Sequence, residues 1–89
     1  MELELRYVAH ITTLTHSVKE KYRTNADTLR DLIDELDKTY VGMKQTFINP
    51  HSGTLQLNAM VYYSTEGETP FAVVNLDIPI QDNAIVTFW

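Results

Sequence analysis

The sequence predicts a small α+β protein in which one main helix packs on one face of a mixed sheet of four to five strands. Three observations lead to this fold class. Apolar and polar residues alternate near both ends of the chain, a central segment repeats its apolar residues with the period of a helix, and turn-forming residues separate the remaining segments. With 89 residues, of which 44% are hydrophobic, the chain has enough apolar side chains for one core but not for two. We therefore expect residues 1–89 to form a single domain.

Two strands open the chain. Leu3, Leu5 and Tyr7 alternate with charged residues, which is typical of a half-buried strand and predicts one over residues 2–10. Residues 12–16 are expected to form a connection. Residues 18–23 also alternate but are more polar, so we expect a second strand there, at an edge of the sheet. The two strands together form a β-hairpin.

The main helix follows this hairpin. Thr28 and Asp31 have the spacing of a helix capping signal, which predicts a helix that begins near residue 28, although Asp27 is a rival N-cap. Gly42 supplies a C-terminal stop. The apolar residues of the helix fall on one stripe, which must pack on the sheet: Leu29, Leu32, Ile33, Leu36 and Tyr40.

The second half of the chain alternates between turn formers and short apolar runs. In chain order we expect an irregular turn at 43–48, a chain reversal at 49–53, a strand at 57–63, a turn at 65–70, a short strand at 71–74, a tight turn at 82–83 and a last strand at 84–89.

The composition argues against several classes of function. A net charge of −5 with seven scattered basic residues argues against binding to nucleic acid. An acidic N-terminus and short apolar stretches argue against export and membrane insertion, so we expect a cytoplasmic protein. One group of acidic residues offers a surface for a basic partner, although a solvated helix face is the more common role of such a group. This group comprises Asp31, Asp34, Glu35 and Asp37.

The sequence offers no catalytic or metal-binding motif. There is no cysteine, and the three histidines, at positions 10, 16 and 51, lack the close spacing of a metal site. The serines lack the context of a nucleophile, and no glycine-rich phosphate loop is present. We therefore expect a protein that is not an enzyme and that holds no cofactor and no metal.

Four stretches of the chain resemble the MoaD/ThiS family of ubiquitin-like sulfur-carrier proteins, which includes the small subunit of molybdopterin synthase. They are Leu5-Arg6-Tyr7-Val8-Ala9, Thr28-Leu29-Arg30-Asp31-Leu32-Ile33, Tyr40-Val41-Gly42-Met43 and the run from Leu76 to Phe88. The resemblance implies a ubiquitin-like β-grasp, which also agrees with two strands, a helix and three further strands in fewer than 90 residues.

The resemblance also implies a function, and the C-terminus bears on it. In that family an adenylating enzyme activates a C-terminal glycine, and the resulting thiocarboxylate donates sulfur in pathways such as molybdopterin biosynthesis. This sequence ends at Phe88-Trp89, and its three glycines, at positions 42, 53 and 67, lie far from that end. We therefore expect a non-catalytic binding module or accessory subunit without sulfur-carrier chemistry. The alternatives are a sulfur carrier, such as a molybdopterin synthase small subunit, in a tail-less form, and a small subunit of a larger metabolic enzyme.

Strand alternation also predicts a binding surface. If the residues on one side of the sheet face the helix, six mostly apolar residues on the other side face outward. In a β-grasp the last strand lies between the first and the third, so these six residues become neighbours and form an apolar patch. These six are Val8, Met60, Tyr62, Ile85, Thr87 and Trp89. We expect them to dock a protein, such as an adenylating enzyme, the large subunit of a synthase or a larger enzyme complex. Homo-oligomerisation and packing of Trp89 over a core edge are the alternatives.

Overall fold

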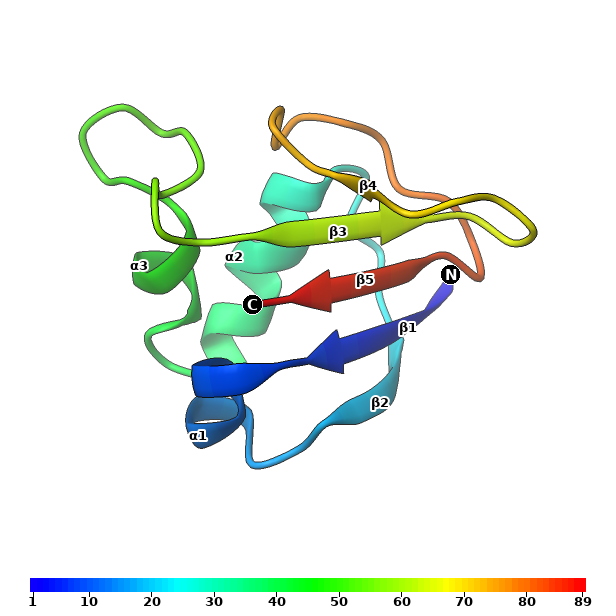
Figure 1. The fold of residues 1–89 in the computed structure, drawn as a ribbon, viewed down its shortest axis with the longest axis horizontal. Coiled ribbons are helices and arrows are strands. Elements are labelled where there is room, and N and C mark those ends of the chain that lie inside the picture. The colour runs from blue at the N-terminus through cyan, green and yellow to red at the C-terminus, as the bar shows by residue number, and fades with distance from the viewer.

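The computed structural model describes residues 1–89 as a five-stranded mixed sheet with its helices on one face (Figure 1). The predicted α+β class and β-grasp arrangement are confirmed. The elements in chain order are β1 (Glu2–Tyr7), the 3-10 helix η1 (Ala9–Ile11), α1 (Thr12–Thr15), β2 (Lys19–Arg23), α2 (Leu29–Thr39), α3 (Met43–Phe47), β3 (Val61–Ser64), β4 (Phe71–Ala72) and β5 (Ile85–Phe88).

The last strand lies at the centre of the sheet, as predicted. The strand order is β2-β1-β5-β3-β4, with β1 and β5 parallel and the other neighbours antiparallel. Leu5 of β1 pairs with Val86 of β5, and Tyr63 of β3 pairs with the same valine from the other side. The two ends of the chain are thus joined by hydrogen bonds, and β2 lies at an edge, as its polar sequence predicts.

The core lies between the sheet and α2. The four apolar residues within α2 are completely buried, which confirms this part of the predicted stripe. Its fifth predicted member, Tyr40, is the C-cap of the helix and is half-buried. Burial of each such side chain contributes about 1.5 to 3 kcal/mol. The inward-facing residues of the three central strands are buried against them: Leu3, Leu5, Tyr7, Val61, Tyr63, Val86 and Phe88.

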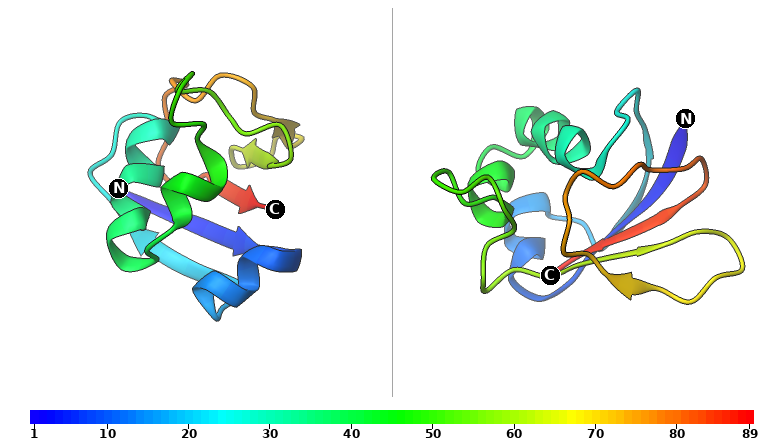
Figure 2. Two further views of the ribbon diagram at one scale, coloured as in Figure 1. Left: turned by 90° about the vertical axis from the view of Figure 1, so that its left-hand side faces the viewer. Right: turned by 90° about the horizontal axis from the view of Figure 1, so that it is seen from above.

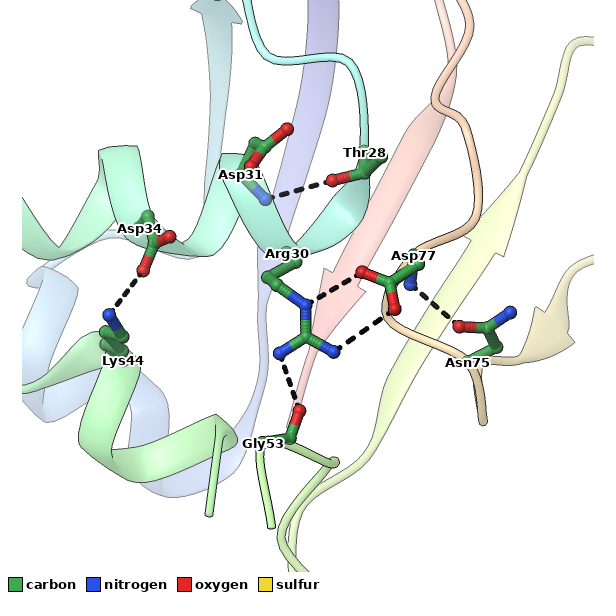
Figure 3. Close-up of polar contacts among 8 residues, drawn as sticks. All are labelled: Thr28, Arg30, Asp31, Asp34, Lys44, Gly53, Asn75 and Asp77. Carbon is green, nitrogen blue, oxygen red and sulfur yellow. Dashed lines mark hydrogen bonds and ion pairs between the residues drawn. The ribbon is translucent and has the colours of Figure 1, made fainter. Parts of the chain in front are cut away.

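Thr28 is the N-cap of α2. Its backbone is extended and its hydroxyl accepts a hydrogen bond of 3.2 Å from the backbone N–H of Asp31 (Figure 3). The rival Asp27 is exposed, and its side chain makes no hydrogen bond. The helix ends at Thr39, and Gly42 lies beyond it with φ of 107°, a left-handed conformation that favours glycine.

Replacing Thr28 by alanine should lower the free energy of unfolding by about 1 kcal/mol, because one N–H of the first turn loses its partner. Replacing Asp27 by alanine is the matched control and should change the free energy by less than about 0.5 kcal/mol. Urea denaturation of both variants measures the difference. Equal losses would contradict the assignment of Thr28 as the cap.

Arg30 joins α2 to two loops that are distant in sequence. Its Nε donates to Asp77 Oδ1 at 2.8 Å, and its Nη1 donates to the carbonyl oxygen of Gly53 at 2.6 Å (Figure 3). The adjacent guanidinium holds the pKa of the Asp77 carboxyl below its usual value. These bonds anchor the loops before and after β3 and β4 to the helix, so they fix the far half of the sheet relative to the core.

The segment after β1 differs from the prediction. The strand expected over residues 2–10 ends at Tyr7, and η1 begins within that range, while α1 forms most of the expected connection. The hydroxyls of Thr12 and Thr13 donate to the carbonyl oxygens of Ala9 and His10, both at 2.7 Å. Such local side-chain bonds compete with strand pairing and favour a helical turn.

The irregular turn predicted at 43–48 is wrong, because residues 43–47 form the helix α3. The carboxylate of Asp37 accepts hydrogen bonds from the backbone N–H groups of Gly42 and Lys44 and so stabilises the beginning of α3. The strand expected at 57–63 is also displaced: β3 begins only at Val61, and the side chain of Leu57 is fully exposed.

Candidate functional site

One face of the sheet is not covered by any helix. Figure 2 shows α2 and α3 on one side of the sheet, and the other side, which faces the viewer in Figure 1, is open. We call this open side the outer face. Successive side chains of a strand alternate between the two faces of the sheet. In β1, β5 and β3 one set of side chains is buried in the core, so the side chains between them point to the outer face.

The six predicted site residues lie on the outer face. In the register of the sheet Thr87 of β5 lies between Arg6 of β1 and Tyr62 of β3. The rings of Tyr62 and Trp89 are 6.5 Å apart with an edge-to-face geometry. The backbone N–H of Trp89 donates to the carbonyl oxygen of Met60 at 2.9 Å. The structure thus brings together side chains that are separated by almost 30 positions in the sequence.

The apolar part of this face is concentrated at the end of β5. Met60 is 44% exposed and Trp89 is 48% exposed, whereas Tyr62 is half-buried. We call these three residues the apolar cluster. Val8 is half-buried where β1 ends, and its backbone N–H donates to the carbonyl oxygen of Phe88. Ile85 lies apart from the cluster, beside Glu4, so the six residues do not form one uniform patch.

A recess of about 480 Å³ adjoins the apolar cluster. It is lined by Trp89 and Met60 and by residues of η1, α1, α3 and the segment before β3. Its lining is mainly apolar, with four polar side chains among the ten residues: Ala9, His10, Ile11, Thr13, Leu14, Thr46, Asn58, Ala59, Met60 and Trp89. The sequence did not reveal this recess, because the residues after β1 were expected to continue the strand.

The other half of the outer face is charged. Three pairs of charged residues lie opposite one another on β1 and β2, and all six point to this face. The pairs are Glu2 and Arg23, Glu4 and Lys21, and Arg6 and Lys19. Arg6 also forms an ion pair of 2.6 Å with Glu4. Four of the seven basic residues of the chain are therefore gathered on one face, so the prediction that they are scattered is wrong.

The inner side of β2 is joined to the core and to α2 through two partly buried carboxylates. Glu20 accepts hydrogen bonds from the hydroxyls of Tyr7 and Tyr40, at 2.7 and 2.6 Å. Glu35 of α2 accepts from Tyr22 at 2.8 Å and from Thr24 at 3.0 Å. These bonds hold the edge strand against α2 and fix the orientation of its outward side chains.

The acidic group of α2 is largely used within the protein. Asp34 pairs with Lys44 at 2.9 Å, as Figure 3 shows, while Glu35 binds Tyr22 and Asp37 caps α3. These contacts favour a structural role over the docking of a basic partner. No group of three or more potential metal ligands occurs in the structure. None of its helices has the length and the apolar character needed to cross a membrane.

Comparison with known proteins identifies the fold. No protein-family profile matches the sequence, and no curated protein sequence matches it. Solved structures do match. SAMP1 from Haloferax volcanii superposes with a TM-score of 0.75 at 17% identity, covering 100% of this chain and 93% of that chain. A chain of the Amycolatopsis orientalis BexX/CysO complex has a TM-score of 0.72 at 16% identity, covering 98% and 92%.

A third structure, from Pyrococcus furiosus and described as a molybdopterin converting factor subunit 1, has a TM-score of 0.62 at 20% identity and covers 98% of this chain and 93% of that chain. The chain thus has the ubiquitin-like β-grasp fold. Its structural neighbours are ubiquitin-fold proteins of the MoaD/ThiS type, which confirms the resemblance of fold. At these identities the likeness establishes the fold alone, and the activity has to be argued from the site.

Proposed function

We propose that this protein is a non-catalytic binding module that docks onto a partner protein through its outer face. The observation that carries this proposal is the half-exposed apolar cluster beside an apolar recess, on a sheet face that no helix covers. Aromatic and methionine side chains are enriched in protein interfaces, and exposed apolar clusters of this kind commonly mark them. The BexX/CysO complex is a precedent for this fold within a protein assembly.

Replacing both Tyr62 and Trp89 by alanine should reduce recovery of the partner at least about tenfold in a pull-down from the source cells, because interface aromatics contribute about 2 kcal/mol or more each. The matched control replaces Val18 and Val41 by alanine, because these side chains are 70% and 79% exposed and lie outside the apolar cluster. Quantitative mass spectrometry compares the recovered proteins. Unchanged recovery with the first variant would remove the docking proposal.

A second candidate function is that of a sulfur carrier. The observation that favours it is the fold shared with the Pyrococcus furiosus protein described as a molybdopterin converting factor subunit 1. This candidate requires a natural chain that continues beyond Trp89 to a terminal glycine. Intact mass spectrometry of the native protein, before and after incubation with an adenylating enzyme, ATP and a sulfur donor, separates the two. A thiocarboxylate at a glycine terminus supports the carrier, and an unmodified chain ending at Trp89 excludes it.

A further inference from the structure

We infer that the partner docked by the outer face presents an acidic segment beside its apolar contact, which the protein binds with Lys19, Lys21 and Arg23. We call these three residues the basic strip. This inference rests on the proposed docking function and adds the chemistry of the partner. It follows from the position, pairing and surroundings of the basic strip.

The basic strip is exposed and points to the same face as the apolar cluster. Lys19, Lys21 and Arg23 alternate along β2 with Glu20 and Tyr22, whose side chains bind residues of the core and of α2. Alternation therefore directs all three cations to the outer face. None of the three forms an ion pair within the protein, so their charges are available to a partner.

The net charge of the outward residues of β1 and β2 is opposite in sign to that of the rest of the molecule. The outward residues of β1 and β2 comprise four cations and two carboxylates, a net charge of +2. Since the whole chain carries −5, the remaining residues carry −7. One of the two outer carboxylates, Glu4, is already paired with Arg6. A docking partner with a complementary surface must therefore be acidic where it meets β2.

The distance between the two halves of the face suits one partner. Neighbouring strands lie about 4.8 Å apart, so β2 and β3, separated by β1 and β5, are about 14 Å apart. A standard protein interface is wide enough to cover both strands. One partner can therefore place apolar side chains on the apolar cluster and carboxylates on the basic strip at the same time.

Lysines on an edge strand also have a simpler role, because charges there prevent pairing with the strands of other molecules. That role does not depend on the sign of the charge, since glutamates would protect the edge equally well. Binding of an acidic partner does depend on the sign. Charge reversal therefore separates the two roles.

Two synthetic amphipathic peptides test the inference. Both carry the same apolar face of leucine and phenylalanine, and one is flanked by glutamates where the other is flanked by lysines. Trp89 is the only tryptophan of the chain, so its fluorescence reports the binding of either peptide. The wild-type protein should bind the glutamate peptide at least about tenfold more tightly at low salt, and the preference should shrink near 0.5 M salt.

Charge reversal should remove this preference. Lys19→Glu combined with Lys21→Glu should bring the two affinities together or invert them, and the variant should keep the oligomeric state of wild type in sedimentation. The matched control, Lys38→Glu with Lys44→Glu, changes the net charge equally but acts on α2 and α3, and should keep the wild-type preference. The inference is overturned if wild type binds neither peptide, shows no preference, or keeps its preference after reversal of Lys19 and Lys21.

A further variant distinguishes failure of this inference from failure of the docking proposal. Tyr62→Ala combined with Met60→Ala leaves the Trp89 reporter in place. If wild type binds both peptides equally and this variant binds neither, the docking proposal stands and only the inference is overturned. A glutamate preference that this variant does not weaken supports the basic strip and contradicts the docking proposal. Stronger binding to vesicles of phosphatidylserine and phosphatidylcholine than to the glutamate peptide overturns the assignment of a protein partner.

Discussion

Replacing Phe88 by alanine should lower the free energy of unfolding by about 3 to 5 kcal/mol. Phe88 is completely buried in the central strand β5. Its ring stacks on Tyr7 with centroids 5.9 Å apart and meets Phe47 edge to face at 5.2 Å. The substitution leaves a cavity between the sheet and α3, and Tyr7 of β1 and Phe47 of α3 lose their contacts with the ring. Domains of this size are stable by about 5 to 15 kcal/mol, so the loss is a large part of the total.

Phe71 provides a matched control, because the same side chain is removed from an exposed position. Phe71 lies on the edge strand β4 and is 50% exposed, with one aromatic neighbour, Tyr63, at 5.7 Å. Its replacement by alanine should cost about 1 kcal/mol or less. Urea denaturation followed by circular dichroism measures both variants. Similar losses for Phe88 and Phe71 would show that β5 does not pack as the structure describes.

The parts of the fold that the sequence predicted best are those determined by local patterns. The helix α2 could be predicted because its apolar period and its cap at Thr28 lie within one continuous segment. The strands β1, β2 and β5 could be predicted because alternation marks which side chains face the core. The same alternation placed Tyr62 and Trp89 on the open face before any contact between them was known.

The helix α3 could not be predicted in this way. Five residues form little more than one turn, which is too short for a period to be recognised. Its beginning depends on Asp37, which lies on the preceding helix and accepts hydrogen bonds from Gly42 and Lys44. Met43 is also completely buried in the core, and this burial depends on the tertiary structure rather than on the local sequence.

The gathering of Arg6 and the basic strip on one face escaped prediction for a different reason. Along the sequence Arg6 and Lys19 are 13 positions apart, and their charges look unrelated. Only the antiparallel register of β1 and β2 places them opposite each other on one face. A count of charges along the chain therefore described the whole molecule correctly as acidic. It missed the difference in charge between the two faces, because that difference depends on how β1 and β2 pair.

Raising the pH above about 10 should destabilise the protein, because three tyrosines are held in their protonated form by the fold. Burial, followed by the hydrogen bond to Glu20, raises the pKa of Tyr7 well above its usual value. Burial and Glu35 do the same to the pKa of Tyr22. The hydrogen bond to Glu20, followed by burial, raises the pKa of Tyr40. Ionisation of these hydroxyls would remove the donors that bind both carboxylates.

The sign of the effect follows from proton linkage. Unfolded tyrosine loses its proton near pH 10, whereas the folded protein retains it to a higher pH. Above pH 10 the unfolded state therefore binds fewer protons, and the free energy of unfolding falls as the pH rises. The stabilisation by the raised pKa values is fully present below pH 10 and is lost progressively between pH 10 and the folded-state pKa. Tyr7 alone contributes a slope of about 1.4 kcal/mol per pH unit in this range.

Urea denaturation of wild type and of Tyr7→Phe at several pH values between 8 and 11.5 measures this slope. Tyr7→Phe should be less stable than wild type at pH 8, because Glu20 loses one of its two donors, but its stability should fall less steeply above pH 10. Its curve should therefore approach that of wild type as the pH rises. Parallel curves would show that Tyr7 does not carry the alkaline transition. They would also contradict the role of Glu20 in holding β2, and with it the basic strip, against the core.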